Sequence, residues 1–270
     1  MPILDIKSYV KQEKEKMAAA VANMQPVSLL IMQVGDNPAS NSYIKGKMND
    51  CREIGIEPVL LKGNGSDIFK GHHNIISRMN EFHGIILQLP VENEKIKKEL
   101  LDCIHAYQDV DGFKPGSPYT PCTPAGIIDY LENGLNIDLC GKVVTVIGKG
   151  ELVGKPLLPL LMEKGSTIIS CNSKTQNLQK MVENADIIIT ATGVPNLIKA
   201  DWIKSGQIIL DAGTGFDENG KLCGDVEKEL YTANRCWVSS VPGGVGLLTR
   251  LQLLKNTVKA AERRELVARK

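Results

Sequence analysis

Short runs of Val and Ile recur along the chain, and they show little alternation between hydrophobic and polar positions. Strands that are buried on both faces of a sheet have this pattern, because neither face meets water. The runs predict eight strands, at residues 27–34, 59–61, 84–89, 142–148, 166–171, 185–190, 207–211 and 237–241.

Segments with helical periodicity separate these strands. They are 6–24, 41–54, 68–82, 92–105, 125–133, 153–164, 176–184 and 246–266. Strands that alternate with helices predict an α/β fold with mainly parallel sheets.

The stretch 112–124 holds four prolines and two glycines, which is typical of a connection between domains. We therefore expect two α/β domains with a cleft between them. The first domain is predicted at 1–118, and the C-terminal helix, 246–270, packs back on it. The second is predicted at 119–245 as a Rossmann-type nucleotide-binding domain.

The overall composition excludes several classes of protein. Lys and Arg number 32 and Asp and Glu number 31, so the net charge of +1 does not favour a nucleic-acid partner. A spanning helix needs about 20 mostly apolar residues, and none is found, so no membrane partner is expected. The seven cysteines have no CxxC spacing, which favours reduced thiols in a cytoplasmic protein. The four histidines have no metal-ligand spacing, and we expect no metal.

A glycine-rich turn follows the predicted strand 142–148 and precedes a helix. Such a turn lets backbone N–H groups approach a pyrophosphate, and the helix N-terminus attracts the anion. A tight turn with a purely structural role is the alternative. The nucleotide hypothesis assigns cofactor binding to Gly148, Lys149, Gly150, Val153 and Gly154.

The next strand ends without the acidic residue that usually holds the ribose of NAD. No Asp or Glu occurs between residues 164 and 182, and Ser173 and Lys174 follow the strand instead. A hydroxyl and a cation suit a 2′-phosphate, and Lys149 is predicted to reach the same area. We therefore expect NADP, with NAD possible; a solvated polar loop is the alternative for Lys174.

Further small or hydroxyl residues follow the later strands. Thr192, Gly193 and Gly213 are expected to meet the cofactor, because ligands of open α/β sheets bind at the carboxyl ends of strands. Three glycines in 242–246 also permit close backbone approach to a ligand. A structural turn explains one or two of these three.

Polar residues in the first half form a second candidate site. Tyr43 and Lys47 share one helix face at i and i+4, and a lysine beside an aromatic ring is partly desolvated and suited to proton exchange. Gln88 lies in an apolar strand, where an unpaired amide costs about 1–3 kcal/mol. Asp109 and Asp111 share a turn. Each has a structural alternative. Lys47 can be a solvated lysine beside a core tyrosine, and Gln88 can make a purely structural hydrogen bond. The two aspartates can reflect ordinary Asp-Gly turn chemistry.

Seven short motifs follow one another along nearly the whole chain. They are 34–40, leading into Tyr43 and Lys47, then 84–90, 109–113, 121–126, 153–156, 224–226 and 242–246. Together they resemble the methylenetetrahydrofolate dehydrogenase/methenyltetrahydrofolate cyclohydrolase family.

The resemblance implies an enzyme that oxidises 5,10-methylenetetrahydrofolate with a nicotinamide cofactor and hydrolyses the methenyl product to 10-formyltetrahydrofolate. It implies that Lys47 orients the folate and transfers protons, that Tyr43 packs on the folate, and that Gln88 hydrogen-bonds the lysine. It also implies that Asp111 anchors the pterin ring and that the protein is a homodimer through its cofactor domains. The residues expected to line the folate from the last glycine turn are Pro242, Gly243, Gly244 and Val245.

The chain departs from the family pattern at Lys149–Gly150, at 239–240 and at Leu247. Four alternatives therefore remain beside the bifunctional enzyme. They are a cyclohydrolase alone, an NAD-dependent dehydrogenase of the same family, an oxidoreductase like shikimate dehydrogenase, and a folate- or dinucleotide-binding protein without turnover.

Overall fold

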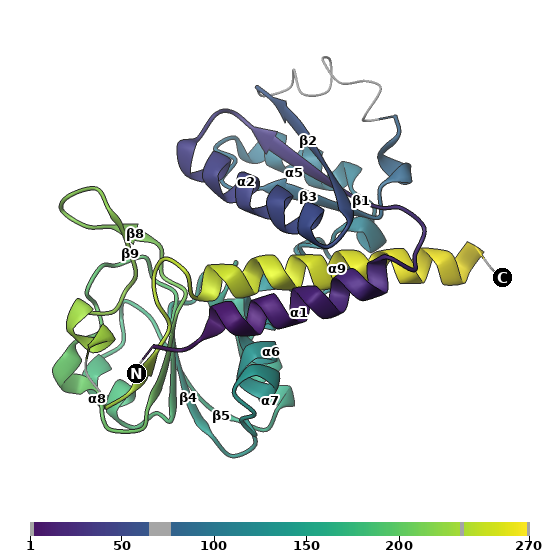
Figure 1. Ribbon diagram of the computed structural model, residues 1–270. Coiled ribbons are helices and arrows are strands. Elements are labelled where there is room, and N and C mark those ends of the chain that lie inside the picture. The colour runs from purple at the N-terminus through teal and green to yellow at the C-terminus, as the bar shows by residue number, and fades with distance from the viewer. Residues whose placement is uncertain (1–2, 65–76, 233–234, 269–270) are drawn as a thin grey trace. The chain divides into compact units, whose positions relative to one another are not determined.

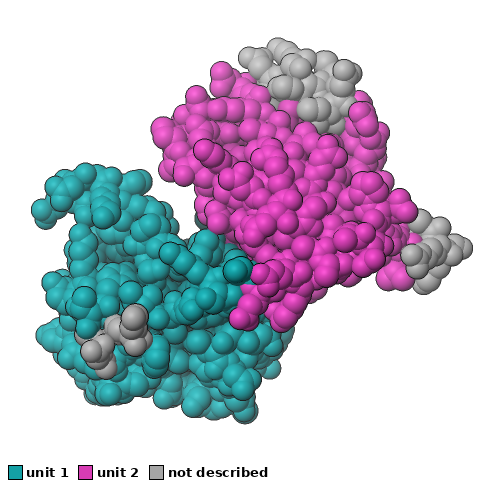
Figure 2. Space-filling view, viewed as in Figure 1, with its two compact units in different colours: residues 1–11, 123–249 teal, residues 12–122, 250–270 magenta. Residues whose placement is uncertain are grey.

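The computed structural model describes residues 3–64, 77–232 and 235–268. They fold into two compact units, which Figure 2 draws in different colours. Unit 1 comprises Met1–Lys11 and Thr123–Thr249, and unit 2 comprises Gln12–Cys122 and Arg250–Lys270. Helices α1 (Ile6–Val21) and α9 (Val245–Ala268) each contribute residues to both units.

The N-terminal residues differ from the predicted 1–118 domain, because they belong to unit 1. Ile3 forms a β-bridge with Val238, and the Leu4 N–H donates to the Val238 carbonyl at 2.9 Å. These backbone contacts attach the start of the chain to the last strand of unit 1.

Unit 2 is built on a parallel three-stranded sheet in the order β2-β1-β3 (Figure 1). Strand β1 (Val27–Val34) pairs with β2 (Ile56–Gly63) on one side and with β3 (Gly84–Gln88) on the other. Helices α2 (Pro38–Glu53) and α5 (Glu94–Cys103), with the 3-10 turns η1 (Met79–Glu81) and η2 (Ala106–Gln108), complete its elements. Its core is apolar, with Leu30, Met32, Leu61, Ile85, Leu87 and Leu100 among its members.

Strand β2 begins at Ile56, three residues before the predicted start. It is longer because its whole length pairs with β1, from Val27↔Ile56 to Val34↔Gly63. Most of the predicted helix 68–82, with His72 and His73, lies outside the described residues, and the part that is described contains η1.

Unit 1 contains a parallel five-stranded sheet in the order β10-β7-β6-β4-β5 (Figure 1). Its strands are β4 (Val143–Ile147), β5 (Thr167–Cys171), β6 (Ile187–Thr190), β7 (Ile208–Asp211) and β10 (Trp237–Val238). Counted along the chain this is the doubly wound order 2-1-3-4-5, in which the winding reverses between β4 and β6. The sheet of unit 2 reverses in the same way between β1 and β3. Ligands of such sheets bind where the order reverses, outside the carboxyl ends of the strands.

The other described elements of unit 1 surround this sheet. They are α6 (Cys122–Asp129, whose first residue belongs to unit 2), the π-helical turn η3 (Tyr130–Gly134), α7 (Gly154–Glu163), α8 (Leu178–Glu183), η4 (Ala200–Trp202), η5 (Lys228–Tyr231) and the hairpin of β8 (Gly215–Phe216) and β9 (Leu222–Cys223). In the part of the chain that the structure describes, every helix is too short or too polar to cross a membrane.

Candidate active site

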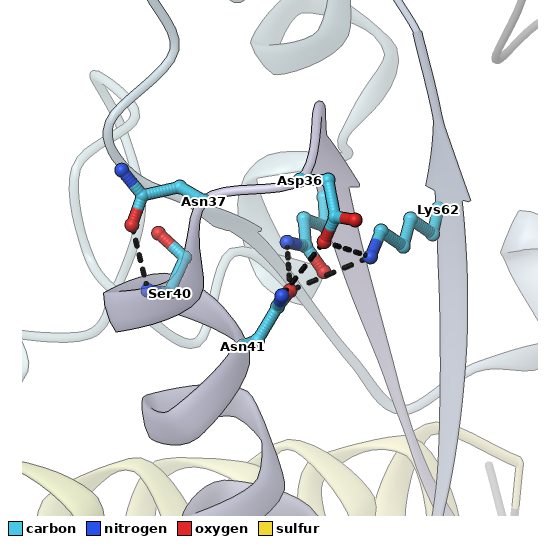
Figure 3. Close-up of polar contacts among 6 residues, drawn as sticks. Asp36, Asn37, Ser40, Asn41 and Lys62 are labelled. Carbon is cyan, nitrogen blue, oxygen red and sulfur yellow. Dashed lines mark hydrogen bonds and ion pairs between the residues drawn. The ribbon is translucent and has the colours of Figure 1, made fainter.

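The first turn of α2 is fixed to the sheet of unit 2 by polar side chains (Figure 3). Asn37 caps the helix, and its side chain accepts a hydrogen bond from the Ser40 N–H at 3.1 Å. Asp36 pairs with Lys62 of β2 at 2.6 Å and accepts from Asn41 Nδ2 at 2.7 Å. The hydrogen bond from Lys62 is the main cause that lowers the pKa of Asp36. These contacts set the start of the helix that carries the predicted tyrosine and lysine.

The structure brings Tyr43, Lys47 and Gln88 together at the carboxyl ends of β1 and β3. Lys47 Nζ donates to Gln88 Oε1 at 3.1 Å and lies 4.9 Å from the centre of the Tyr43 ring. Both polar side chains are buried, Lys47 at 5% exposure and Gln88 at 8%. Gln88 Nε2 donates to the Leu89 carbonyl at 2.7 Å, which turns the amide oxygen toward the lysine.

The two carboxylates of the turn after η2 have different surroundings. Asp109 is buried and accepts hydrogen bonds from the N–H groups of Gly112 at 3.2 Å and Lys114 at 2.6 Å. Burial is the main cause that raises its pKa. Asp109 therefore builds the turn, whereas Asp111 is only half buried.

Asp111 lies beside the buried thiol of Cys122. Burial raises the pKa of this thiol well above its usual range. The charge of Asp111 and a hydrogen bond with it raise that pKa further, and the charge of Lys47 lowers it. The Cys122 thiol donates to the Val110 carbonyl at 3.4 Å, so it lies against the turn that carries Asp111.

Buried charges hold α2 against the two long helices of unit 2. Asp50 pairs with Lys14 of α1 at 2.5 Å and with Arg250 of α9 at 2.8 Å. A Cβ on Gly46 would overlap the Arg250 guanidinium. Glycine therefore lets Arg250 lie directly against α2, next to the position of Lys47.

The predicted glycine turn of unit 1 joins β4 to α7. Gly148 has a φ of +104°, and a Cβ there would overlap the Ala191 carbonyl. A Cβ on Gly154, the first residue of α7, would overlap the Gly148 carbonyl. Close packing of backbone on backbone thus explains these two glycines. Gly150 has no neighbour within 4 Å of the Cβ position, so the outer side of the turn is open. An open turn before a ten-residue helix fits a bound pyrophosphate.

A polar turn follows β5, next to this glycine turn. The Asn172 N–H donates to Thr175 Oγ1 at 2.9 Å, and the Lys174 N–H donates to Asn172 Oδ1 at 3.0 Å. Ser173 and Lys174 are exposed. The Gly148 N–H donates to the Cys171 carbonyl at 3.0 Å, so Lys149 directly follows a residue that is bonded to the end of β5. The residues predicted to bind a 2′-phosphate therefore share one edge of the sheet.

The turns after β6 and β7 meet at a buried carboxylate. Asp225 Oδ2 accepts from the Thr192 N–H at 2.8 Å, and a Cβ on Gly213 would overlap the same carboxylate. Gly193 has a φ of +72° and faces the Thr214 carbonyl, which would be 3.2 Å from a Cβ there. Thr192, Gly193 and Gly213 are thus neighbours in one turn region.

The last glycine turn also lies in unit 1. Gly243 has a φ of +98°, and a Cβ on Gly244 would overlap the Ser240 carbonyl. Pro242 precedes them, and Val245 is the first residue of α9. Packing explains Gly244, in keeping with the structural alternative for part of this turn.

Both halves of the chain match one family of enzymes. The model described as "Tetrahydrofolate dehydrogenase/cyclohydrolase, catalytic domain" matches residues 4–111. The model described as "Tetrahydrofolate dehydrogenase/cyclohydrolase, NAD(P)-binding domain" matches residues 121–265. The chain belongs to the tetrahydrofolate dehydrogenase/cyclohydrolase family.

Individual relatives match the chain over nearly its whole length. The bifunctional protein FolD of Bacillus subtilis (strain 168) is 38% identical over 277 residues, which cover 97% of this chain and 98% of the relative. The crystal structure of the bifunctional enzyme FolD from Campylobacter jejuni has a TM-score of 0.86 and 35% identity, with 97% of this chain and 99% of that chain covered. The FolD of Trypanosoma brucei, complexed with NADP cofactor and inhibitor, has a TM-score of 0.87 and 26% identity, with 97% of each chain covered.

The predicted α/β fold, its two domains and the enzyme family are confirmed by these matches. Matches to both domains of the family decide against an oxidoreductase like shikimate dehydrogenase. The predicted catalytic residues fall within the catalytic-domain match; they are Tyr43, Lys47, Gln88 and Asp111. The predicted cofactor residues, 148–213, fall within the NAD(P)-binding match.

Sequence reasoning missed the buried amides that hold the Asp111 turn. Asn256 Nδ2 donates to the Val110 carbonyl at 2.9 Å, and Gln252 Nε2 donates to Asn256 Oδ1 at 2.8 Å. The Cys122 thiol donates to the same Val110 carbonyl at 3.4 Å. Two amides four residues apart, among the leucines of α9, were the available signal.

A surface hollow of about 620 Å³ lies at the other edge of the unit 1 sheet. Lys142, Asp186 and Gln207 line it, and each directly precedes a strand. None of the predicted site residues lines this hollow. Because ligands of doubly wound sheets bind at the carboxyl ends of strands, we do not assign the hollow to the active site.

Proposed function

We propose that the protein oxidises 5,10-methylenetetrahydrofolate with NADP and hydrolyses the resulting 5,10-methenyltetrahydrofolate to 10-formyltetrahydrofolate. The observation that carries this proposal is the buried lysine of unit 2, with Lys47 Nζ 3.1 Å from Gln88 Oε1 and 4.9 Å from the Tyr43 ring centre. Family membership and the two domain matches support it.

Hydrolysis needs a group that takes a proton from water as the water adds to the methenyl carbon. Lys47 is the group in unit 2 that we assign to this role. Gln88 Oε1 accepts one N–H of the lysine and so fixes the direction of the amine. The positive charge of the methenyl group opposes a second positive charge beside it, which favours an amine that can accept the proton.

The folate is held by a ring and a carboxylate in this proposal. Tyr43 is half buried and carries a flat apolar face beside Lys47, which suits packing against the pterin. Asp111 accepts hydrogen bonds from the N–H groups of the pterin edge. We assign the backbone of Pro242, Gly243, Gly244 and Val245 to the folate as well.

Bound NADP would supply the hydride acceptor for the oxidation. Gly148, Gly150, Val153 and Gly154 would hold its pyrophosphate through backbone N–H groups, since the outer side of this turn is open. Lys149, Ser173 and Lys174 would hold the 2′-phosphate, and Thr192, Gly193 and Gly213 would line the remaining edge. The relative from Trypanosoma brucei, which was solved with NADP, supports this assignment.

We also propose that the protein is a cytoplasmic homodimer that associates through unit 1. Family resemblance supports the dimer, and Cys51, Cys122, Cys171 and Cys236 are free buried thiols, which suits a reducing compartment. Light scattering coupled to size-exclusion chromatography measures the mass directly. A monomer at micromolar concentration contradicts the dimer.

A paired assay on the purified protein tests the proposed function. One arm follows cofactor reduction with methylenetetrahydrofolate and NADP or NAD, and the other follows the loss of methenyltetrahydrofolate alone. The proposal expects NADP reduction in the first arm and hydrolysis in the second. Hydrolysis without reduction contradicts the dehydrogenase, reduction with NAD alone contradicts the cofactor, and no turnover from folded protein favours a binding protein.

A further inference from the structure

The motif Gly224-Asp225-Val226 contributes to the family resemblance but has no role in the function proposed above. The structure buries Asp225 completely, at 0% exposure. Its Oδ2 accepts two hydrogen bonds, from Thr190 Oγ1 at 2.5 Å and from the Thr192 N–H at 2.8 Å. One carboxylate oxygen therefore holds both the end of β6 and the turn that follows it.

A second buried carboxyl group lies close to the first. Asp211 ends β7 and is 1% exposed. Its oxygens accept from the N–H groups of Gly213 at 2.9 Å and Val226 at 3.1 Å. Asp211 thereby connects the turn after β7 to the segment that carries Asp225.

Two glycines are required by this carboxyl pair. A Cβ on Gly213 would overlap the carboxylate of Asp225, and a Cβ on Gly224 would overlap that of Asp211. Gly213, which the sequence predicts to bind the cofactor, is therefore needed for its close contact with Asp225.

Burying Asp211 and Asp225 lowers the stability of the native state, because burying charged groups costs several kcal/mol unless they are fully paired. Asp225 Oδ1 is buried and has no hydrogen-bond partner. Apolar side chains fill such a space at lower cost, so a structural role alone leaves the two carboxyl groups unexplained.

The turn held by Asp225 supports the turn after β4. Between Thr190 and Thr192 lies Ala191, whose carbonyl is packed against the Cα of Gly148. The Gly148 carbonyl is packed in turn against Gly154, where α7 begins. Because these contacts leave no room for a Cβ, a shift of the turn after β6 must move the glycine turn as well.

We propose that Asp225, assisted by Asp211, is a positioning residue for NADP, holding the turn after β6 so that the turn before α7 keeps the shape that receives the pyrophosphate. This inference rests on the proposed function, because it assigns the cofactor to these turns. Asp225 acts through backbone and hydroxyl groups and does not itself touch the cofactor.

Three variants separate this role from general stability. Asp225→Ala removes both accepted hydrogen bonds. Thr190→Val removes one of them and keeps the shape. Asp225→Asn keeps one oxygen that accepts both bonds and places an N–H group where Oδ1 lies, near the Asp211 carboxyl. Asp217→Ala is the control, because Asp217 is a carboxylate of the same unit whose hydrogen bonds within the described residues join it to the β8–β9 hairpin and to Lys228, and not to the turns after β4 or β6.

The readouts are NADP affinity and the rate of methenyltetrahydrofolate hydrolysis. Trp202 and Trp237 are the chain's two tryptophans and both lie in unit 1, so their fluorescence reports binding there. Loss of a hydrogen bond to a charged group is worth about 1.5–3 kcal/mol, which is about tenfold or more in Kd. We expect that increase for Asp225→Ala and a smaller one for Thr190→Val, with Asp225→Asn and Asp217→Ala within about threefold of wild type. Hydrolysis stays unchanged in all four, because Lys47, the residue to which we assign its proton transfer, lies in unit 2, whereas the substituted residues lie in unit 1.

Several results overturn the inference. Folded Asp225→Ala protein that binds NADP as wild type does removes the basis for the positioning role. If Asp225→Ala does not fold, unchanged NADP affinity in Thr190→Val removes that basis instead. Loss of hydrolysis together with NADP binding indicates general destabilisation. Wild-type protein that does not bind NADP contradicts the proposed function itself, and the inference with it.

Discussion

In unit 2 the candidate site is made of side chains, and in unit 1 the turns assigned to the pyrophosphate are made of backbone. Lys47 of α2 and Gln88 of β3 are buried, and their polar side-chain atoms meet at 3.1 Å. In unit 1, Gly148, Gly154 and Gly213 are needed because carbonyl or carboxylate groups occupy the space of their Cβ atoms.

This difference teaches where a substitution acts. A side chain that projects from a finished helix can be replaced with little effect on the fold, so its loss appears in the chemical step. A glycine under a carbonyl cannot accept a methyl group unless the backbone moves, so its replacement appears in ligand affinity and stability together. Substitutions in both units test that division, from the largest expected effect to the smallest.

The largest effect is expected from Lys47→Met, which keeps the apolar stem and removes the amine. General acid–base groups contribute about 10²–10⁴-fold, so the hydrolysis rate should fall by about that factor. NADP affinity should not change, because the predicted cofactor turns lie in unit 1. Lys45→Met, an exposed lysine on the same helix, is the matched control and should keep full activity. Normal hydrolysis by folded Lys47→Met protein would contradict the assignment of proton transfer to the Lys47 side chain.

Gly154→Ala tests the backbone account of unit 1. The added methyl group meets the Gly148 carbonyl, so the turn must open at a cost of about 1–3 kcal/mol. We expect NADP affinity to fall by about tenfold or more, with hydrolysis retained. Met162→Ala is the control, because Met162 is 69% exposed near the other end of the same helix. Equal tolerance of both substitutions by titration with NADP would refute the division.

Gln88→Met sharpens the assignment within unit 2. It removes the oxygen that accepts from Lys47 and keeps the length of the side chain. One hydrogen bond is worth about 1 kcal/mol, so kcat for hydrolysis should fall by about fivefold to tenfold. Because the pterin contacts assigned to Tyr43 and Asp111 remain, KM should change less than kcat. A change confined to KM would mean that Gln88 binds the folate and does not orient the lysine.

The folding pattern could be predicted from sequence where burial is complete. The Val- and Ile-rich runs indicated the strands of both sheets, because strands buried on both faces show no other pattern. The hairpin of β8 and β9 was missed, because two-residue strands around a polar turn carry no such run. The place of residues 1–11 in unit 1 has no signal in the sequence pattern, because it depends on backbone contacts of Ile3 and Leu4 with Val238.

The candidate site was predictable where its spacing is local. Tyr43 and Lys47 are four residues apart on one helix, so the helical repeat alone put them on the same face. Asn256 was not predictable, because its acceptor, the Val110 carbonyl, is 146 residues away in the chain. The sequence indicated Asp225 only as part of a family motif. Its role in the turn after β6 was not predictable, because one of its partners is a backbone N–H group 33 residues away.

Asn256→Leu tests whether backbone support also matters in unit 2. It leaves the Val110 carbonyl without its amide donor and Gln252 without its acceptor. We expect a loss of about 1–3 kcal/mol in the free energy of unfolding and a threefold to tenfold rise in KM for methenyltetrahydrofolate, through Asp111. Lys259→Leu, an exposed position on α9, is the control. An unchanged KM would mean that the buried amides contribute to the stability of the fold and not to folate binding.

The last prediction concerns the pH dependence of stability, and it belongs to the carboxyl pair of unit 1. The pKa of Asp211 is raised to about 7, mainly by burial and also by the charge of Asp225, while backbone hydrogen bonds to the carboxyl group oppose the rise. Burial raises the pKa of the Tyr231 hydroxyl, and the charge of Asp211 raises it further.

A carboxyl group whose pKa is raised by folding binds its proton more tightly in the native state than in the unfolded chain. Its contribution to stability is therefore complete below a pH of about 4 and is lost as the pH rises toward 7. Urea unfolding followed by tryptophan fluorescence should give a lower midpoint at pH 8 than at pH 5. Asp211→Asn cannot ionise, so this variant should flatten that difference, whereas Asp217→Asn should not. If Asp211→Asn keeps the difference in midpoint between pH 5 and pH 8, the pH dependence arises from other groups and not from the carboxyl pair.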